Sequence, residues 1–339
     1  MIENVTLSAL PKVELHIHLD CSLSYQVVRT ISPDITFQIY QSDFIAPEKC
    51  KSLSDFLSCA ASAIGLMQTR EHLQLVVRDL FDQLASENVI YAEIRFAPLL
   101  HTSGGLQPEE IVESVADAVV RCIEETGVRA GIILCTLRHY SEKQSMETVK
   151  LVRQCMSSLP LVGFDLAADE AGFPIEAHKK AFLYAIRHDI PRTAHAGEAR
   201  GPASIWETLE HLQPARIGHG VRCIEDPKLV EHIAASQIHL EVCPSCNIQT
   251  NIFDTYCDHP VDVLYRSGVS LGINTDARTL VNMSLSQEYQ TLIDVFNWSV
   301  TDLLQCNMNA VDHSFADQEE KKILKDILRS AYGKDSQSR

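Results

Sequence analysis

The pair His16 and His18 lies within Val13–Asp20, a stretch whose alternation of polar and apolar residues is typical of a β-strand. In a strand, residues i and i+2 point to the same face, so the two imidazoles would project together. Two neighbouring imidazoles suit a shared metal ion. Taken alone, the pair is equally consistent with two half-buried histidines on a strand of a sheet or barrel.

Further residues that could bind a metal or move a proton follow later strand-like segments. These are His195-Ala-Gly-Glu198, His219-Gly220 and Asn274-Thr-Asp276. Three imidazoles and one carboxylate make a site for zinc or a similar divalent ion, with a position left for water. Zinc lowers the pKa of a water that it binds to about 7. The presence of such residues at four strand ends is stronger evidence for a shared site than any one of the motifs.

Glu198 and His219 are candidates for proton transfer. Glu198 follows His195 by three residues, so it can lie beside the metal without binding it, and a carboxylic acid there could donate a proton to a substrate. His219 could take the water's proton or hold the resulting hydroxide. The alternatives are an acid at a helix start, favoured by the helix dipole, and a histidine at a strand end.

Eight strand-like segments alternate with helical ones. The strands are expected at 13–20, 89–97, 130–137, 161–167, 192–196, 215–218, 238–242 and 269–273. This order predicts an α/β fold, a closed (β/α)8 TIM barrel, with a doubly wound open sheet as the alternative. Additional helices are expected after the first strand, over 22–86, and at the C-terminus, over 284–330. In such a barrel, catalytic groups gather at the C-terminal ends of the strands.

The composition narrows the class of protein. The net charge is −16, with 45 acidic and 29 basic residues, which argues against general binding to nucleic acid or to an anionic membrane. No secretory signal or transmembrane run is visible, and eleven scattered cysteines favour the reducing cytoplasm. We interpret Cys243-Pro-Ser-Cys246 as a strand-end turn rather than a zinc or redox site. Nothing in the sequence specifies an oligomeric state.

Four motifs together resemble the adenosine deaminase family of metal-dependent hydrolases in the amidohydrolase superfamily. They are Leu10-Pro-Lys-Val-Glu-Leu-His-Ile-His-Leu-Asp20, His195-Ala-Gly-Glu198, Arg216-Ile-Gly-His-Gly220 and Asn274-Thr-Asp276, and the similarity runs from about residue 7 to residue 310 in the family's order. The resemblance implies that residues 1–339 form one hydrolase barrel domain. It also implies a zinc enzyme that replaces the 6-amino group of adenosine with oxygen and releases ammonia.

The resemblance also assigns roles to residues. Zinc, one ion per chain, would be held by His16, His18, His195 and Asp276. Glu198 would protonate N1 of the purine, and His219 would orient or deprotonate the attacking water. The purine nucleoside would contact His18, Asp20 (at the ribose 5′-hydroxyl), the backbone N–H of Ala168 (at N3) and a helical lid that contains Leu53, Phe56 and Leu57.

Three positions depart from the family pattern. Cys21 and Ala168 stand where glycine is usual, and Ala277 stands where a second aspartate contacts purine N7. Arg278 would point to the opposite face if the strand continued, so it is a poor replacement. A missing hydrogen-bond partner can change specificity strongly. The alternatives to adenosine are therefore another aminopurine, such as an N6-substituted adenosine or aminodeoxyfutalosine, and a barrel that binds a nucleoside without turnover. The presence of Glu198 and His219 speaks against the last.

Overall fold

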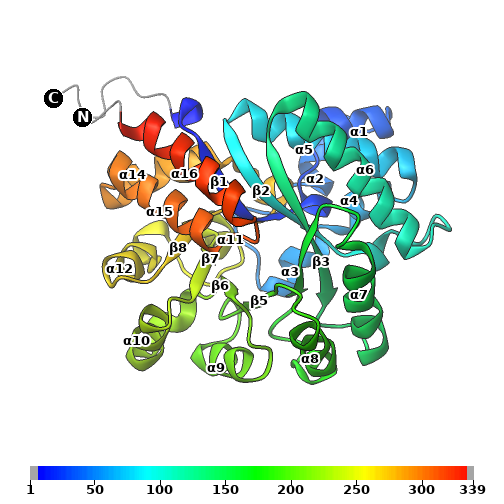
Figure 1. The fold of residues 1–339 in the computed structure, drawn as a ribbon. Helices are drawn as coiled ribbons and strands as arrows, with labels where there is room; N and C mark the ends of the chain where they lie inside the picture. Colours follow the sequence, from blue (N-terminus) through cyan, green and yellow to red (C-terminus); the bar gives the residue numbers. More distant parts are fainter. Residues whose placement is uncertain (1–6, 334–339) are drawn as a thin grey trace.

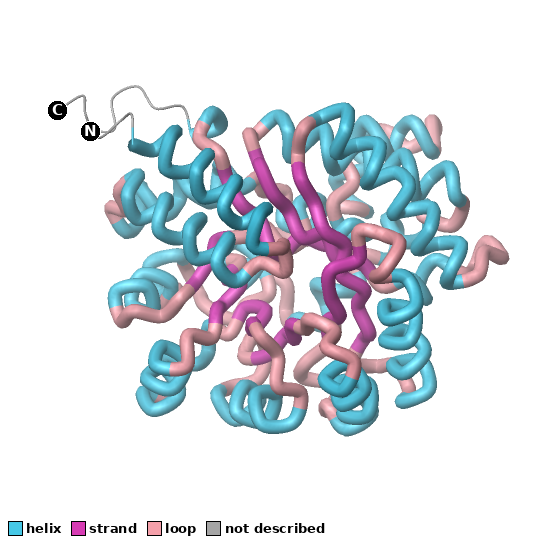
Figure 2. Tube along the Cα trace, viewed as in Figure 1, coloured by secondary structure: helices cyan, strands magenta, loops and turns pink. Residues whose placement is uncertain are grey.

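A computed structural model describes residues 7–333 of the chain. Eight parallel strands form the centre and the helices surround them as an outer ring (Figures 1 and 2). The strands are β1 (Lys12–His18), β2 (Val89–Phe96), β3 (Arg129–Leu137), β4 (Leu161–Ala167), β5 (Thr193–Ala196), β6 (Arg216–His219), β7 (His239–Val242) and β8 (Leu271–Ile273). Their order in space follows their order in the sequence. The predicted (β/α)8 TIM barrel is confirmed.

The barrel consists of two four-stranded sheets, β1–β4 and β5–β8, joined at two seams. At the β4–β5 seam, the Phe164 N–H donates to the carbonyl of Pro191 at 3.0 Å. At the β8–β1 seam, the His18 N–H donates to the Asp276 carbonyl at 2.7 Å, and the Asp276 N–H donates to the His16 carbonyl at 3.0 Å. The second seam is therefore closed by the backbones of residues predicted to hold the metal.

The additional helices lie where they were predicted. After β1 come α1 (Tyr25–Ile31), α2 (Phe37–Asp43), α3 (Leu53–Ser58), α4 (Ala61–Leu66) and α5 (Arg70–Ser86). The C-terminal helices are α14 (Leu285–Phe296), α15 (Val300–His313) and α16 (Gln318–Gly333). Among residues 7–333, none of the helices is both long and apolar enough to span a membrane.

The remaining helices connect successive strands. They are α6 (Pro108–Thr126), α7 (Glu142–Cys155), α8 (Lys179–Arg187), α9 (Pro202–His211), α10 (Pro227–Ala235), α11 (Pro244–Gln249), α12 (Val261–Arg266) and α13 (Arg278–Val281). The longest, α6, shows how the sequence sets both ends. Pro108 occupies the first turn, Gln107 and Glu110 form a capping box, and Gly127 ends the helix with a φ of 75°. Its buried stripe includes Ile111, Val115 and Val119.

Two strand predictions are wrong at their ends. The first strand stops at His18, because Leu19–Cys21 turns into a 3-10 helix that carries Asp20. The eighth strand begins only at Leu271, since the Val269 N–H bonds back to Leu264 at the end of α12. That strand also does not continue to Arg278, which begins α13.

Candidate metal and proton-transfer site

The four side chains predicted to hold a metal converge at the C-terminal end of the barrel. His16 and His18 come from β1, His195 comes from β5, and Asp276 follows β8. One ligand atom of each lies within 4.8 Å of the others. Nε2 of His18 is 3.3 Å from Nε2 of His195, and Nε2 of His16 is 3.1 Å from Oδ1 of Asp276. The four side chains are close enough to hold one cation.

Carboxylates orient two of the three imidazoles from the side away from this cluster. Glu241 on β7 lies 2.8 Å from Nδ1 of His16, and Asp165 on β4 lies 3.2 Å from Nδ1 of His195. Because a carboxylate accepts, each Nδ1 donates and each Nε2 keeps its lone pair toward the cluster. Nε2 of His16 is buried and has no hydrogen-bond partner within the described chain. A buried nitrogen of this kind fits a metal ligand.

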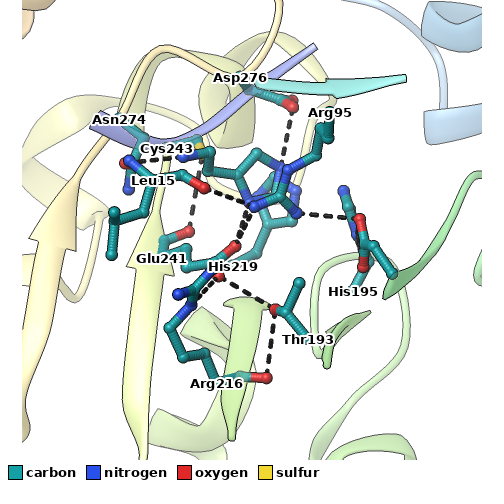
Figure 3. Close-up of polar contacts among 12 residues, drawn as sticks. Leu15, Arg95, Thr193, His195, Arg216, His219, Glu241, Cys243, Asn274 and Asp276 are labelled. Carbon is teal, nitrogen blue, oxygen red and sulfur yellow. Dashed lines mark hydrogen bonds and ion pairs between the residues drawn. The ribbon is translucent and has the colours of Figure 1, made fainter. Parts of the chain in front are cut away.

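Arg95 on β2 ties these two carboxylates together. Its guanidinium donates to Asp165 at 2.9 Å and to Glu241 at 2.7 Å, and it also donates to the carbonyl of Leu15 at 2.6 Å. Figure 3 shows Arg95 in the middle of this network, with Arg216 on the far side of Glu241. In the sequence these residues are recognisable only as parts of strands. In the fold they fix the orientation of the imidazoles.

Burial and neighbouring charges set the protonation states. Burial lowers the pKa of His18 to about 4, so its ring is neutral near pH 7, the form that binds a metal. Burial works to raise the pKa of Asp276, but the neighbouring imidazoles of His16, His18 and His219 outweigh it and hold that pKa well below its usual range. Asp276 is therefore an ionised carboxylate, as a divalent cation requires.

A second group of possible ligands overlaps with the first. His16 and Asp276 also lie within 4.8 Å of ligand atoms of His219 and Cys243. Burial raises the pKa of the Cys243 thiol well above its usual range, which disfavours the thiolate that binds metals. The two groups share His16 and Asp276, so only one can be filled at a time, and we favour the group that contains His18 and His195.

Glu198 is held beside the cluster by its backbone. The carboxylate of Glu170 accepts N–H donors from Gly197 at 2.8 Å, Glu198 at 3.0 Å, Ala199 at 2.8 Å and Arg200 at 2.9 Å. This role of Glu170 was not predicted. Burial raises the pKa of Glu198 well above its usual range, and its Oε1 has no partner within residues 7–333. A buried, protonated acid of this kind can donate to a bound molecule.

His219 ends β6 and lies next to Glu198. Its Nε2 is 3.6 Å from Oε2 of Glu198, and its Nδ1 is 3.1 Å from the amide nitrogen of Asn247. His219, Asp276 and Ala168 all have left-handed backbones, with φ values of 59°, 64° and 76°. Such a conformation costs a residue other than glycine about 1–2 kcal/mol. This strain falls where three strands end, at the site itself.

Two cavities meet at the site. The inner one is lined by the candidate metal and proton-transfer residues and by apolar residues that include those of α3 and α13: His18, Cys21, Leu53, Phe56, Leu57, Ala168, His195, Glu198, His219, Asp276, Ala277 and Leu280. The outer cavity has a volume of about 370 Å³ and contains Asp20 in its wall. His18, Cys21, Leu57 and Ala168 line both cavities. Three residues of α3 thus line the inner cavity.

The three departures from the family pattern also lie here. Ala277 is buried in the wall of the inner cavity, and its backbone N–H and carbonyl are occupied by Thr275 and Val281. Arg278 cannot replace a missing carboxylate, because it is buried in ion pairs with Glu14 and Glu87. Outside the cavity wall, the Cys246 thiol donates to Oδ2 of Asp276 at 2.8 Å. The second cysteine of the Cys-Pro-Ser-Cys motif therefore contacts a candidate metal ligand.

Comparison with known proteins identifies the family. A family model for adenosine deaminase matches residues 11–331. The chain belongs to the adenosine deaminase family. The adenosine deaminase of Streptococcus mutans is 33% identical over 339 residues, which cover 98% of this chain and 97% of that protein.

Two solved structures extend the comparison. Adenine deaminase from Arthrobacter aurescens is 27% identical, with a TM-score of 0.87, and the match covers 95% of this chain and 99% of that one. The N6-mAMP deaminase of Arabidopsis is 26% identical, with a TM-score of 0.85, and the match covers 96% and 99%. The adenosine deaminase family is metal-dependent, and the cluster at the barrel end fits an ion. The names of these three relatives give three different aminopurine substrates: adenosine, adenine and N6-mAMP.

Proposed function

We propose that this chain is a hydrolytic deaminase of adenosine or a closely related 6-aminopurine nucleoside, with one zinc ion per chain. The observation that carries the proposal is a single juxtaposition. A cluster of three imidazoles and a carboxylate lies beside Glu198, whose pKa burial raises and whose Oε1 is unpartnered among the described residues. Hydrolysis at an amidine carbon needs both an activated water and a proton donor for the ring nitrogen.

The residues at the site would have separate roles in the reaction. His16, His18, His195 and Asp276 would hold zinc, which acts as a Lewis acid and activates a water. Glu198 would donate its proton to N1 of the purine, so that C6 becomes electrophilic. The backbone bonds to Glu170 fix the turn from which Glu198 projects. The buried surroundings of Glu198 keep its proton in place until the substrate is bound.

The charge of the outer cavity favours a nucleoside over a nucleotide. Its described lining contains Asp20 and Asp169 and no lysine or arginine. A 5′-phosphate placed there would meet carboxylates without a cation, which costs free energy. The N6-mAMP deaminase of Arabidopsis, by its name, acts on a nucleotide. We infer that this chain binds a nucleoside with an uncharged ribose instead. Asp20 would accept a hydrogen bond from the 5′-hydroxyl, and the Ala168 N–H would donate one to purine N3.

Because of Ala277, a different aminopurine stays an alternative substrate. Its methyl group offers no hydrogen bond to the five-membered ring, and the neighbouring Leu280 offers none either. An N6-substituted adenosine or aminodeoxyfutalosine therefore stays an alternative substrate. A nucleoside-binding barrel without turnover is disfavoured, because Glu198 would then serve no purpose in its buried, unpartnered state.

The test is a screen for the release of ammonia or methylamine by zinc-loaded protein. The substrates are adenosine, N6-methyladenosine (which releases methylamine in place of ammonia), aminodeoxyfutalosine, adenine and AMP. The proposal expects turnover of at least one nucleoside, and a kcat/KM for AMP at least about 100-fold below that for adenosine. Preference for AMP would contradict the inferred role of the outer cavity. Binding of a nucleoside without turnover of any of the five would favour the binding-only alternative.

We further infer that residues 1–339 form one domain and that the protein works in the cytoplasm on small molecules, without nucleic-acid or membrane partners. The net charge of −16 and the pattern of eleven cysteines support this inference.

A further inference from the structure

A chain of hydrogen bonds runs from the start of α12 to His219. The backbone N–H of Val261 donates to Nδ1 of His259 at 3.2 Å. Nε2 of His259 lies 3.2 Å from Oδ1 of Asn247, and Nδ2 of Asn247 lies 3.1 Å from Nδ1 of His219. All three side chains are almost completely buried, with exposed fractions of 2% for His259, 0% for Asn247 and 1% for His219.

The Val261 N–H sets the donor and acceptor of every hydrogen bond in this series. A backbone N–H can only donate, so Nδ1 of His259 must accept. In a neutral ring the proton then sits on Nε2, which must donate to the oxygen of Asn247. The amide nitrogen of Asn247 consequently faces His219 and donates to Nδ1. His219 is left with its own proton on Nε2, the nitrogen that faces the site.

The ring of His259 is neutral in this environment. Burial lowers the pKa of His259 to about 3. A neutral imidazole carries one proton, so fixing the acceptor on one nitrogen fixes the donor on the other. Nε2 of His219 points toward Glu198, with 3.6 Å between it and Oε2.

We propose that Asn247 and His259 are positioning residues that hold His219 as the Nε2–H tautomer, so that His219 donates a hydrogen bond to the attacking oxygen instead of removing its proton. The inference rests on the proposed deaminase function and chooses between two roles for His219 that the sequence leaves open. A nitrogen that already carries a proton cannot act as a base. As a donor it orients the oxygen and stabilises negative charge on it.

The tautomer itself can be measured without any turnover. Zinc-loaded protein labelled with 15N-histidine gives distinct NMR shifts for protonated and unprotonated ring nitrogens, and the His219 signals are assigned by their loss in His219→Gln. We expect the proton on Nε2 and an unprotonated Nδ1. A proton on Nδ1 would overturn the proposal. This readout does not depend on knowing the substrate, so it separates failure of the proposal from failure of the proposed function.

The variant Asn247→Asp reverses the polarity of the bond at nearly constant shape. A carboxylate accepts, so His219 would donate from Nδ1 and present a bare Nε2, which makes it a better base. If His219 acts as a donor, kcat should fall by about 100- to 1,000-fold, the usual effect of losing one such donor, while KM changes by only a few-fold. Parent-like or higher kcat, with the proton shown on Nδ1, would overturn the donor role.

His259 gives an independent test through a rescue pair. His259→Leu removes the donor to Asn247, so the amide loses its fixed orientation and the Nε2–H signal of His219 should weaken together with kcat. His259→Gln places an N–H near the former Nε2 and should restore both. Equal loss of kcat in the two variants, with the His219 signals unchanged, would show that His259 only fills space, contrary to the proposal.

A matched control is Asn307→Asp, which introduces an acid at another buried asparagine. Asn307 bonds to Val13 and Tyr289, away from the site. This variant should lose stability without altering the His219 tautomer. A change of tautomer in Asn307→Asp would mean that the NMR shift reports general destabilisation, and the proposal would lose its support.

Discussion

Replacing Glu198 with glutamine isolates the proton that the proposed reaction needs. The change is nearly isosteric and leaves the backbone N–H of residue 198 bonded to Glu170, so the turn should keep its shape. An amide cannot transfer a proton to N1 of the purine. General acid catalysis contributes about 100- to 10,000-fold. We therefore expect kcat to fall by that factor, which corresponds to about 2.7–5.5 kcal/mol of activation free energy.

The structure places the expected loss toward the upper end of this range. Oε1 of Glu198 is buried and unpartnered in the described chain, so its proton is available to a bound purine. Burial raises the pKa of Glu198, so the folded parent keeps a proton that the unfolded chain releases. Glutamine does not titrate, and the variant should be at least as stable as the parent at neutral pH.

The assay follows nucleoside turnover by ultraviolet absorbance, with thermal melting and zinc content measured on the same samples. Glu170→Gln serves as the control, because it weakens the acceptor of the turn and should lower kcat and melting temperature together. Activity of Glu198→Gln within a few-fold of the parent would refute the proton-donor role and leave Glu198 as a structural acid.

Three further predictions concern the metal, the substrate and pH. The parent should hold about one zinc per chain, and His16→Ala or Asp276→Ala should lose most of it by metal analysis; full occupancy in a folded double variant would contradict the ligand assignment. Ala277→Asp should raise kcat/KM for adenosine by about 5-fold, the worth of one hydrogen bond of about 1 kcal/mol, and should lower it for a different natural substrate. A parent that strongly prefers adenosine and is weakened by this change would disprove the altered specificity. Burial raises the pKa of Glu288 from 4.5 to about 8, so the free energy of unfolding should fall as pH rises across that interval, by up to about 1.4 kcal/mol per unit. Glu288→Gln should flatten this slope in urea unfolding at several pH values, and an unchanged slope would rule out Glu288 as its source.

The convergence of the candidate metal ligands was predictable because each belongs to a strand end. His16 and His18 share a face by the period of the strand, and a parallel barrel brings the ends of distant strands together. Glu198 was predictable for the same reason, through its short distance from His195 in the sequence. The pattern of eight strands was enough to choose the barrel, since alternating strands and helices leave few other ways to pair.

The supporting residues could not be found in this way. Asn247 bonds to His219, and His259 bonds to Asn247, only because α11 and the segment before α12 are brought to the end of β6, an arrangement that no short-range pattern encodes. Glu170 reaches the turn after β5 from the loop after β4. The surroundings of Arg278 were not predictable either, because the chain turns at Asp276, with a left-handed φ of 64°, and the period of a strand does not extend beyond it.

The central claim is that the chain replaces an amino group on a purine nucleoside with oxygen from water. The most direct test incubates zinc-loaded protein with adenosine and the other screened nucleosides in water enriched in oxygen-18, and measures product mass and released amine. We expect a product that carries one atom of oxygen-18 for every amine released. Absence of product from every nucleoside by fully zinc-loaded protein, or a product without the label, would contradict the claim.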